Sequence, residues 1–289
     1  MNRIQAKFSG LAAAGRKALV PFFTAGDPAL EAAVPVMHAL VAAGADVLEL
    51  GVPFSDPMAD GPSIQRSSER AISRGGGLRH TLEAVAAFRR DDAETPVVLM
   101  GYLNPVEIRG AGVFAHDAAR AGVDGVLLVD LPPEEAAPYR DAFDAAGVAL
   151  IALASPTTPE DRVARIAEGA RGYVYYVSRA GVTGVGTIDR ADVAARVATL
   201  RARCPVRVVV GFGIREAATG AALAAVSDGV VVGSALVEAM ADAASAAEAA
   251  ARAGAFLAPL RAAIDAAPAG DPAGARGLHF PPRSGPVAE

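Results

Sequence analysis

Several features that define common classes of protein are missing from this 289-residue chain. Cys204 is the single cysteine, so no internal disulfide can form, which is consistent with a reducing compartment. No uncharged stretch approaches the roughly 20 residues of a membrane span, and no basic block with interleaved aromatics supports nucleic-acid binding. The N-terminus carries Lys7, Arg16 and Lys17 where a signal peptide needs apolar residues. A soluble, cytoplasmic protein with a net charge of −5 is therefore expected.

The residue patterns of several enzyme classes are also absent. The histidines are scattered without an i,i+4 pair or a ligand cluster, which argues against a metal site. No Ser-His-Asp arrangement and no catalytic cysteine is recognisable. No lysine falls at the end of a predicted strand, which argues against an aldolase that works through a Schiff base.

What the chain does contain is a regular alternation of short β-branched runs and Ala-rich segments of helical period, such as Ala29–Ala43 and Glu134–Ala146. Eight buried strands, each followed by a helix, favour a closed parallel (β/α)8 barrel, the TIM barrel, over an open sheet. The predicted strands are Ala18–Phe23, Asp46–Leu50, Pro96–Met100, Gly125–Val129, Ala149–Leu153, Tyr173–Val177, Arg207–Val210 and Gly229–Val232.

Residues 1–267 are expected to form this barrel as a single domain, with Asn2–Ala14 as a short amphipathic helix that plugs its bottom. Three junctions, at 43–46, 121–124 and 146–149, carry an Ala-Gly-x-Asp/Ala pattern in which the glycine suits the left-handed end of a helix. From Pro268 the chain is rich in proline and glycine without periodicity. We expect 268–289 to be a disordered tail with no functional role.

Two intervals between strand starts, from Asp46 to Pro96 and from Tyr173 to Arg207, are longer than the others. The extra length predicts extended loops after strands two and six, on the C-terminal face where barrel enzymes keep their chemistry. Long loops that contain glycine at a barrel mouth are candidates for mobile lids.

The loop after strand two contains the most informative stretch, LELGVPFSDPMADG at 48–61. Glu49 lies in an apolar run, so burial should raise its pKa, whereas Asp60 lies in a proline-stiffened, more solvated loop. Two carboxylic acids in unlike environments can supply an acid and a base at one pH. A buried cation paired with Glu49, or a turn-capping role for Asp56 and Asp60, is the structural alternative.

Two glycine-containing turns indicate a phosphate site. Gly211-Phe212-Gly213 follows strand seven and Gly233-Ser234 follows strand eight, where barrels often bind phosphate through backbone N–H groups. Gly184 could add a third backbone contact from the loop after strand six. Glycine also serves tight turns for purely geometric reasons, so one such motif alone is a weak signal.

Apolar and aromatic residues at the strand ends could line a pocket for an aromatic group. Phe22, Met100 and Phe212 lie at such ends, although core packing would also explain them. Tyr173 and Tyr175 share a face of strand six by alternation. If that face is the barrel interior, Tyr175 could reach the substrate.

These segments together resemble the tryptophan synthase alpha chain family, and the resemblance runs from about Lys7 to Leu260. LELGVPFSDPMADGPSIQ is the family signature. The other matching segments follow in order at the family's spacing: PFFTAGDP at 21–28, GYLNP at 101–105, SRAGVTG at 178–184, GFGI at 211–214 and GSA at 233–235.

The resemblance implies a lyase of tryptophan biosynthesis that cleaves indole-3-glycerol phosphate to indole and glyceraldehyde 3-phosphate by a retro-aldol reaction. Glu49 matches the acid–base group that moves protons at indole C3 and at the glycerol hydroxyl. Asp60 matches the second catalytic carboxylate, which interacts with the indole N–H. Thr183 matches a lid threonine that helps to place Asp60.

The resemblance also implies binding residues and a partner. The substrate pocket would contain Phe22, Tyr175 and Phe212, and the phosphate cradle would contain Gly184, Gly213, Ile214, Gly233 and Ser234. The contact surface for a beta chain would include Asp56, Pro57 and Asn104, in an α2β2 heterotetramer. Pyridoxal phosphate would belong to the beta chain, with no cofactor in this chain. Glu107 departs from the family pattern near Asn104, within the surface implied for the partner, and the long C-terminal tail is also atypical of the family.

Two alternatives stay open at this point. Another phosphate-binding barrel of tryptophan or histidine biosynthesis, such as an isomerase or an indole-glycerol-phosphate synthase, would not require the 48–61 loop, and a synthase should place a lysine at a strand end. A weakly active subunit that serves mainly to activate a beta chain would not require Glu49, Asp60 and Thr183.

Overall fold

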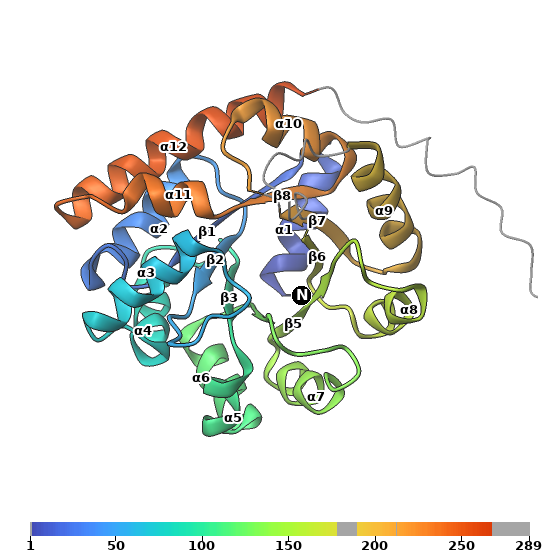
Figure 1. The fold of residues 1–289 in the computed structure, drawn as a ribbon, viewed down its shortest axis with the longest axis horizontal. Coiled ribbons are helices and arrows are strands. Elements are labelled where there is room, and N and C mark those ends of the chain that lie inside the picture. The colour runs from blue at the N-terminus through green and yellow to red at the C-terminus, as the bar shows by residue number, and fades with distance from the viewer. Residues whose placement is uncertain (1, 178–189, 212, 268–289) are drawn as a thin grey trace, which may run out of the picture.

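A computed structural model describes residues 2–177, 190–211 and 213–267 of the chain. Eight parallel strands form a closed barrel in sequence order, with β1 paired to β8 (Figure 1). The predicted (β/α)8 barrel is confirmed. The strands are β1 (Ala18–Thr24), β2 (Leu48–Gly51), β3 (Val97–Gly101), β4 (Gly125–Leu128), β5 (Ala149–Ala154), β6 (Tyr173–Val177), β7 (Arg207–Gly211) and β8 (Gly229–Val232).

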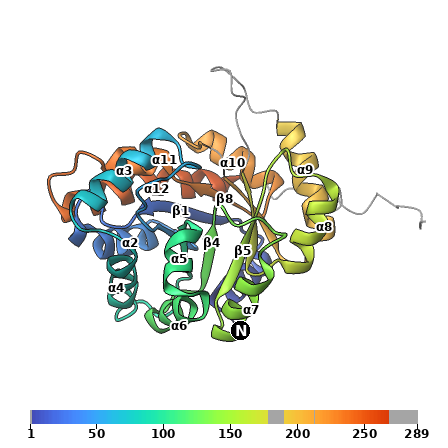
Figure 2. The same ribbon diagram turned by 60° about the horizontal axis from the view of Figure 1, so that its bottom comes forward.

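Helices surround the barrel on its outside, as the two ribbon views agree (Figures 1 and 2). A 3-10 turn, Leu30–Ala32, precedes the first of them. The outer helices are α2 (Ala33–Ala42), α3 (Pro62–Ser73), α4 (Leu78–Phe88), α5 (Leu103–Arg109), α6 (Ala111–Ala121), α7 (Ala137–Ala146), α8 (Glu160–Gly169), α9 (Arg190–Arg203), α10 (Ala217–Val226), α11 (Ser234–Met240) and α12 (Ala246–Ala266). Within the described ranges, no helix is both long and apolar enough to cross a bilayer.

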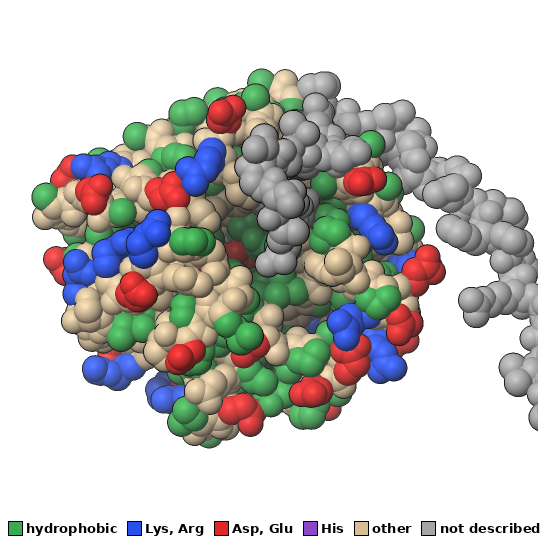
Figure 3. Space-filling model, in the orientation of Figure 1, with side chains coloured by type: hydrophobic (Ala, Val, Ile, Leu, Met, Phe, Trp, Pro, Cys, Tyr) green, Lys and Arg blue, Asp and Glu red, His purple; other side chains and the backbone are tan. Residues whose placement is uncertain are grey.

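The helix α1 (Arg3–Ala13) closes the bottom of the barrel, as predicted. The side chain of Asn2 caps it by accepting a hydrogen bond from the Ile4 N–H at 2.8 Å. Ile4 and Phe8 are buried, and the Phe8 ring lies 5.7 Å from the ring of Tyr173 on β6. With the bottom filled by apolar side chains, a substrate has to enter at the other end. The face turned toward the viewer in Figure 3 is hollowed at its centre.

Three buried aspartates fix the starts of strands at the bottom of the barrel. Asp46, Asp124 and Asp228 each stand one or two residues before a strand. The backbone N–H of each aspartate donates to the carbonyl of one residue on the neighbouring strand. The backbone N–H of that same residue donates in return to the carboxylate of the aspartate. The three partners are Leu19, Val97 and Val208, and the carboxylate bonds are all 2.9 Å long. This reciprocal pairing satisfies backbone groups that would otherwise be buried without partners.

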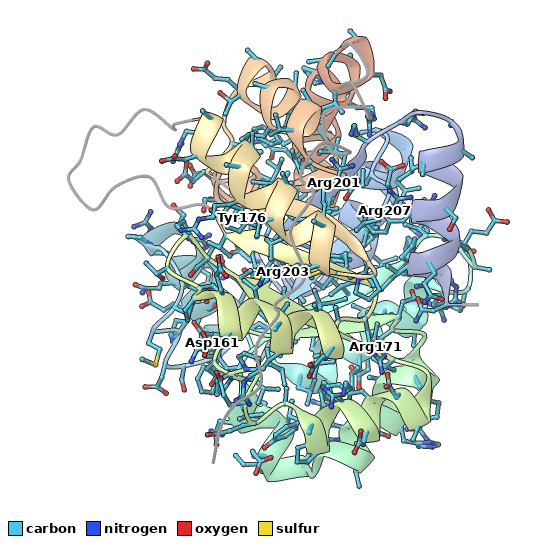
Figure 4. All side chains as sticks on the ribbon, turned by 90° about the vertical axis from the view of Figure 1, so that its right-hand side faces the viewer. Asp161, Arg171, Tyr176, Arg201, Arg203 and Arg207 are labelled. Carbon is cyan, nitrogen blue, oxygen red and sulfur yellow. The ribbon has the colours of Figure 1, made fainter. Side chains whose placement is uncertain are left out.

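Arginines neutralise these aspartates. Arg261 from α12 donates to Asp46 at 2.9 Å, and Arg89 donates to Asp124 at 2.8 Å. Arg201 donates to Asp228 at 2.9 Å. Figure 4 shows Arg201 close to Arg207, which lies 3.6 Å from the same carboxylate.

The glycines of the Ala-Gly-x-Asp/Ala junctions adopt left-handed conformations. Gly122 has a φ of 92° and Gly147 a φ of 75°, where each ends a helix. The predicted role of these glycines is therefore confirmed.

The long interval between β2 and β3 contains more than a loop. Residues 52–61 form the loop that follows β2, and α3 and α4 then follow before β3 begins. The additional length is therefore shared between the loop and an additional helix. The other predicted long loop, at 178–189, and the tail at 268–289 lie outside the described residues.

Candidate active site

Glu49 lies on β2 inside the barrel and is fully buried. It pairs in register with Phe22 on β1 and Val98 on β3, so apolar strands lie on both sides of it. Burial raises the pKa of Glu49 from 4.5 to about 7, because a low-dielectric environment disfavours the charged form. No arginine, lysine or histidine pairs with this carboxylate in the described part of the chain. The expected rise in the pKa of Glu49 is therefore found. The alternative, in which a buried cation pairs with Glu49, finds no support among the described residues.

One oxygen of Glu49 is held and the other is free. The Tyr173 hydroxyl donates a short hydrogen bond to Oε1, which lowers the pKa of Glu49 but by less than burial raises it. Oε2 is buried and has no hydrogen-bond partner among the described residues. A buried polar atom without a partner is rare in folded proteins, and a catalytic role is one of its explanations.

Asp60 lies in the loop after β2 and is only partly exposed. The Tyr102 hydroxyl donates to its Oδ2 at 3.2 Å and accepts the Ala59 N–H at 3.0 Å. Gln65 on α3 donates to the Asp60 carbonyl at 2.9 Å, so the backbone at this position is also held. Burial raises the pKa of Asp60, and the bond from Tyr102 partly opposes this rise.

A pocket at the mouth of the barrel connects Asp60 with the predicted apolar residues. Phe22, Met100, Tyr102 and Asp60 line it together. The Phe22 ring packs against Gly51 so closely that a methyl group added there would lie 2.7 Å from its Cζ atom. An apolar pocket with a carboxylate at its edge suits a flat aromatic group that carries a polar N–H.

Tyr175 shares the interior face with Tyr173, as the strand alternation predicts. Its ring lies over Gly211 on β7, where a side chain would overlap it. The pKa of the Tyr175 hydroxyl is raised by burial and by the negative charges of Glu49 and Asp60, so it is close enough to feel both carboxylates. The neutral hydroxyl is therefore available as a hydrogen-bond donor near the two acids.

Of the predicted phosphate residues, four lie in the described structure. Gly213 and Ile214 follow β7, and Gly233 and Ser234 follow β8, at the mouth of the barrel. Gly213 is exposed, Gly233 and Ser234 are partly exposed, and the Ile214 side chain is buried. Gly233 also touches the Phe22 ring, which places this turn beside the apolar pocket.

Three predicted residues, Thr183, Gly184 and Phe212, lie outside the described residues.

Exposed residues of the loop after β2 and of α5 lie at the same end of the barrel. Asp56 and Asn104 are exposed and Pro57 is partly exposed. Two large apolar side chains close to them in sequence face solvent, Met58 at 87% and Ile108 at 80% exposure. The Asp56 carboxylate accepts the hydroxyl of its neighbour Ser55, and Asp56 is not among the residues that line the pocket of Asp60.

Tyr102 is the functional residue that the sequence reasoning missed. It belongs to the GYLNP segment directly after β3, and an aromatic residue with a hydroxyl at a strand end was an available signal. Tyr173 also contributes to the site, since its hydroxyl donates to the candidate acid Glu49. No group of His, Cys, Asp and Glu suited to a metal ion occurs among residues 2–177, 190–211 and 213–267.

Comparison with known proteins matches this architecture to one family. The model of the family described as tryptophan synthase alpha chain covers residues 8–264. The chain belongs to the tryptophan synthase alpha chain family. The alpha chain of Xanthomonas axonopodis pv. citri (strain 306) is 64% identical to it over 238 residues, which is 82% of this chain and 89% of the relative.

Other members of the tryptophan synthase alpha chain family are also similar to this chain. The alpha chain of Xylella fastidiosa (strain 9a5c) is 63% identical over 237 residues, with 82% of this chain and 88% of the relative covered. The crystal structure of tryptophan synthase subunit alpha from Legionella pneumophila str. Paris superposes with a TM-score of 0.85 at 44% identity, covering 92% of this chain and 99% of that one.

Members of the tryptophan synthase alpha chain family are lyases that cleave indole-3-glycerol phosphate in tryptophan biosynthesis, and this is the activity of the chain. The alpha chain of the family uses no cofactor of its own, since pyridoxal phosphate belongs to the beta chain. Membership in the alpha family also implies a beta-chain partner.

Proposed function

We propose that Glu49 carries both protons of the retro-aldol cleavage. The glycerol hydroxyl next to the ring loses a proton as it becomes the aldehyde of glyceraldehyde 3-phosphate. Indole C3 gains a proton before its bond to that carbon breaks. The two transfers cancel, so one carboxyl group that gives a proton to C3 and then takes the hydroxyl proton as the bond breaks ends in the state in which it began, and the reaction balances.

The observation that supports this role is the state of Glu49 itself. With a pKa near 7, the carboxyl group is divided between its two protonation states at neutral pH. A pKa close to the working pH allows the same group both to give and to take a proton. Tyr173 holds Oε1, while Oε2 has no hydrogen-bond partner among the described residues and is available to the substrate.

Asp60 stabilises the positive charge that develops on the indole ring when C3 is protonated. A carboxylate that accepts the indole N–H gains strength as this charge grows, which is the condition for lowering the barrier. Phe22, Met100, Tyr175 and Phe212 hold the indole ring. The phosphate binds to backbone N–H groups at Gly184, Gly213, Ile214, Gly233 and Ser234, and Thr183 helps to place Asp60.

The partner surface is formed by the loop after β2, which contains Asp56 and Pro57, and by the first turn of α5, which contains Asn104, and it binds the beta chain in an α2β2 heterotetramer. The exposed side chains of Met58 and Ile108 support this assignment, because apolar groups at such positions are typical of interfaces. Glu107 accepts a hydrogen bond from Tyr139 on α7, so this departure from the family joins α5 to α7. As a biosynthetic enzyme, the assembly works in the cytoplasm on our proposal.

Substitution of the two carboxylates tests the roles. Glu49→Gln and Asp60→Asn should each lower kcat for indole release by about 100-fold or more, since removal of a positioned acid–base group or of a charge stabiliser has effects of this size. Circular dichroism should report an unchanged fold. The isolated chain and the chain with a beta chain are both assayed, and gel filtration of the mixture tests the heterotetramer. Indole release by Glu49→Gln at the normal rate would contradict the mechanism.

A further inference from the structure

A cluster of polar side chains links three elements around the barrel mouth. Glu238 on α11 accepts Arg215 through two bonds, 2.7 Å from Nη1 to Oε2 and 3.1 Å from Nη2 to Oε1. The Ser63 hydroxyl at the start of α3 donates to Oε1 of the same carboxylate at 2.5 Å. One carboxylate therefore joins α3, α11 and the loop after β7, which are far apart in the sequence.

Each end of this cluster leads to a different part of the proposed site. Ser63 and Gln65 belong to the first turns of α3, and Gln65 holds the Asp60 carbonyl at 2.9 Å. Arg215 follows Ile214 directly, and Glu238 stands four residues after Ser234, on the same face of α11. The cluster thus lies between the loop that carries Asp60 and the residues proposed to bind phosphate.

From this arrangement we infer that Glu238 is a positioning residue that couples phosphate binding to the placement of Asp60. This inference rests on the proposed function, because it needs both the phosphate site and the role of Asp60. Arg215 neutralises Glu238 next to the phosphate, and Ser63 transmits the position of α11 to the loop after β2. Bidentate arginine–carboxylate contacts fix orientation better than a single contact does, so the link has a defined geometry.

The charges of Glu238 and Arg215 should affect phosphate affinity in a way that a merely structural ion pair would not. Without the Glu238 charge, Arg215 becomes free to attract phosphate, and the repulsion between carboxylate and phosphate also disappears. Without Arg215, the Glu238 charge stands unneutralised near the phosphate. The two substitutions should therefore change phosphate affinity in opposite directions, although they break the same ion pair.

The experiment measures kcat, KM for indole-3-glycerol phosphate and the inhibition constant of inorganic phosphate in the full chain. In Glu238→Gln, kcat should fall and phosphate should inhibit more tightly, each by about fivefold, the size expected for a partly exposed charge. In Arg215→Gln, phosphate should inhibit about fivefold more weakly. Ser63→Ala should lower kcat and leave phosphate inhibition unchanged. High salt should reduce the two effects on phosphate.

The matched control is Asp144→Asn. Asp144 also forms a bidentate ion pair with an arginine, Arg171, away from the mouth, and its carboxylate is about as exposed as that of Glu238. This variant should keep the wild-type constants, and thermal unfolding of every variant checks the fold. Shifts of phosphate inhibition in the same direction for Glu238→Gln and Arg215→Gln would overturn the inference, as would a normal kcat in Glu238→Gln. The proposed function fails separately, if Glu49→Gln releases indole normally.

Discussion

The two ends of the barrel use buried carboxylates in opposite ways. At the bottom, Asp46, Asp124 and Asp228 each accept a backbone N–H and each contact an arginine. At the mouth, Glu49 and Asp60 have only tyrosine hydroxyls as side-chain donors among the described residues, and burial raises the pKa of both. Burial also raises the pKa of Asp46 at the bottom, but the Leu19 N–H and Arg261 partly offset that rise. The same chemical group therefore serves structure where it is neutralised and serves proton transfer where it is not.

The difference has a thermodynamic consequence. Substitution of a buried, paired aspartate should be costly, because it leaves a backbone N–H without its partner and takes the nearest carboxylate away from an arginine. A buried, unpaired carboxyl group works against folding whenever it ionises, since the unfolded chain can solvate the charge. The paired aspartates at the bottom therefore stabilise the fold, whereas the ionised, unpaired carboxyl group at the mouth destabilises it.

The largest expected effect concerns Asp124. Asp124→Ala should lower the free energy of unfolding by about 3–5 kcal/mol, because Arg89 is largely buried and would lose its main partner. Urea unfolding monitored by circular dichroism measures this change. Asp144→Ala is the control, since its ion pair with Arg171 is well exposed and should contribute less than about 1 kcal/mol. Equal losses in the two variants would remove the distinction between buried and exposed pairs.

The next effect has the opposite sign. Between pH 4.5 and about 7 the folded chain keeps the Glu49 proton that the unfolded chain releases, so wild-type stability falls as the pH rises through this range. Glu49→Gln does not ionise. Relative to the wild type, the free energy of unfolding of the variant should therefore rise by about 3 kcal/mol between pH 4.5 and pH 8. A stability difference that does not depend on pH would contradict the raised pKa.

A smaller effect should follow from Tyr102→Phe. The substitution removes the donor to Asp60, which should raise the pKa of that carboxyl further and lower kcat by about fivefold to 20-fold, the loss expected for one hydrogen bond to a charged group. The acidic limb of the pH–rate profile should move to higher pH. Tyr139→Phe is the matched control, because its hydroxyl bonds to Glu107 at the surface, outside the pocket. An unchanged profile in Tyr102→Phe would show that this bond does not tune Asp60.

Much of the barrel was predictable from local patterns. Buried parallel strands appear as β-branched runs, so all eight were found within one or two residues of their ends. The burial of Glu49 followed from its apolar neighbours on β2 in the same way. The left-handed conformation of Gly122 and Gly147 followed from the demand that a helix end places on its terminal residue.

Other features depend on contacts between distant residues, and no local pattern contains them. Tyr173 and Glu49 are separated by 124 positions, and Tyr102 and Asp60 by 42. The cluster of Ser63, Arg215 and Glu238 forms only after the barrel closes. The division of the β2–β3 interval into α3 and α4 was missed, because a polar loop and the exposed face of a helix have similar composition.

The most direct test of the central claim is a titration of the Glu49 carboxyl group in the folded chain. Carbon-13 NMR of glutamate-labelled protein, with Glu49→Gln used to assign the signal, gives its pKa without reference to activity or stability. We predict a midpoint of about 7 for Glu49. A midpoint at or below 4.5, the ordinary value for glutamate, would mean that a positive charge neutralises Glu49 after all, and it would contradict the contrast between the two ends of the barrel.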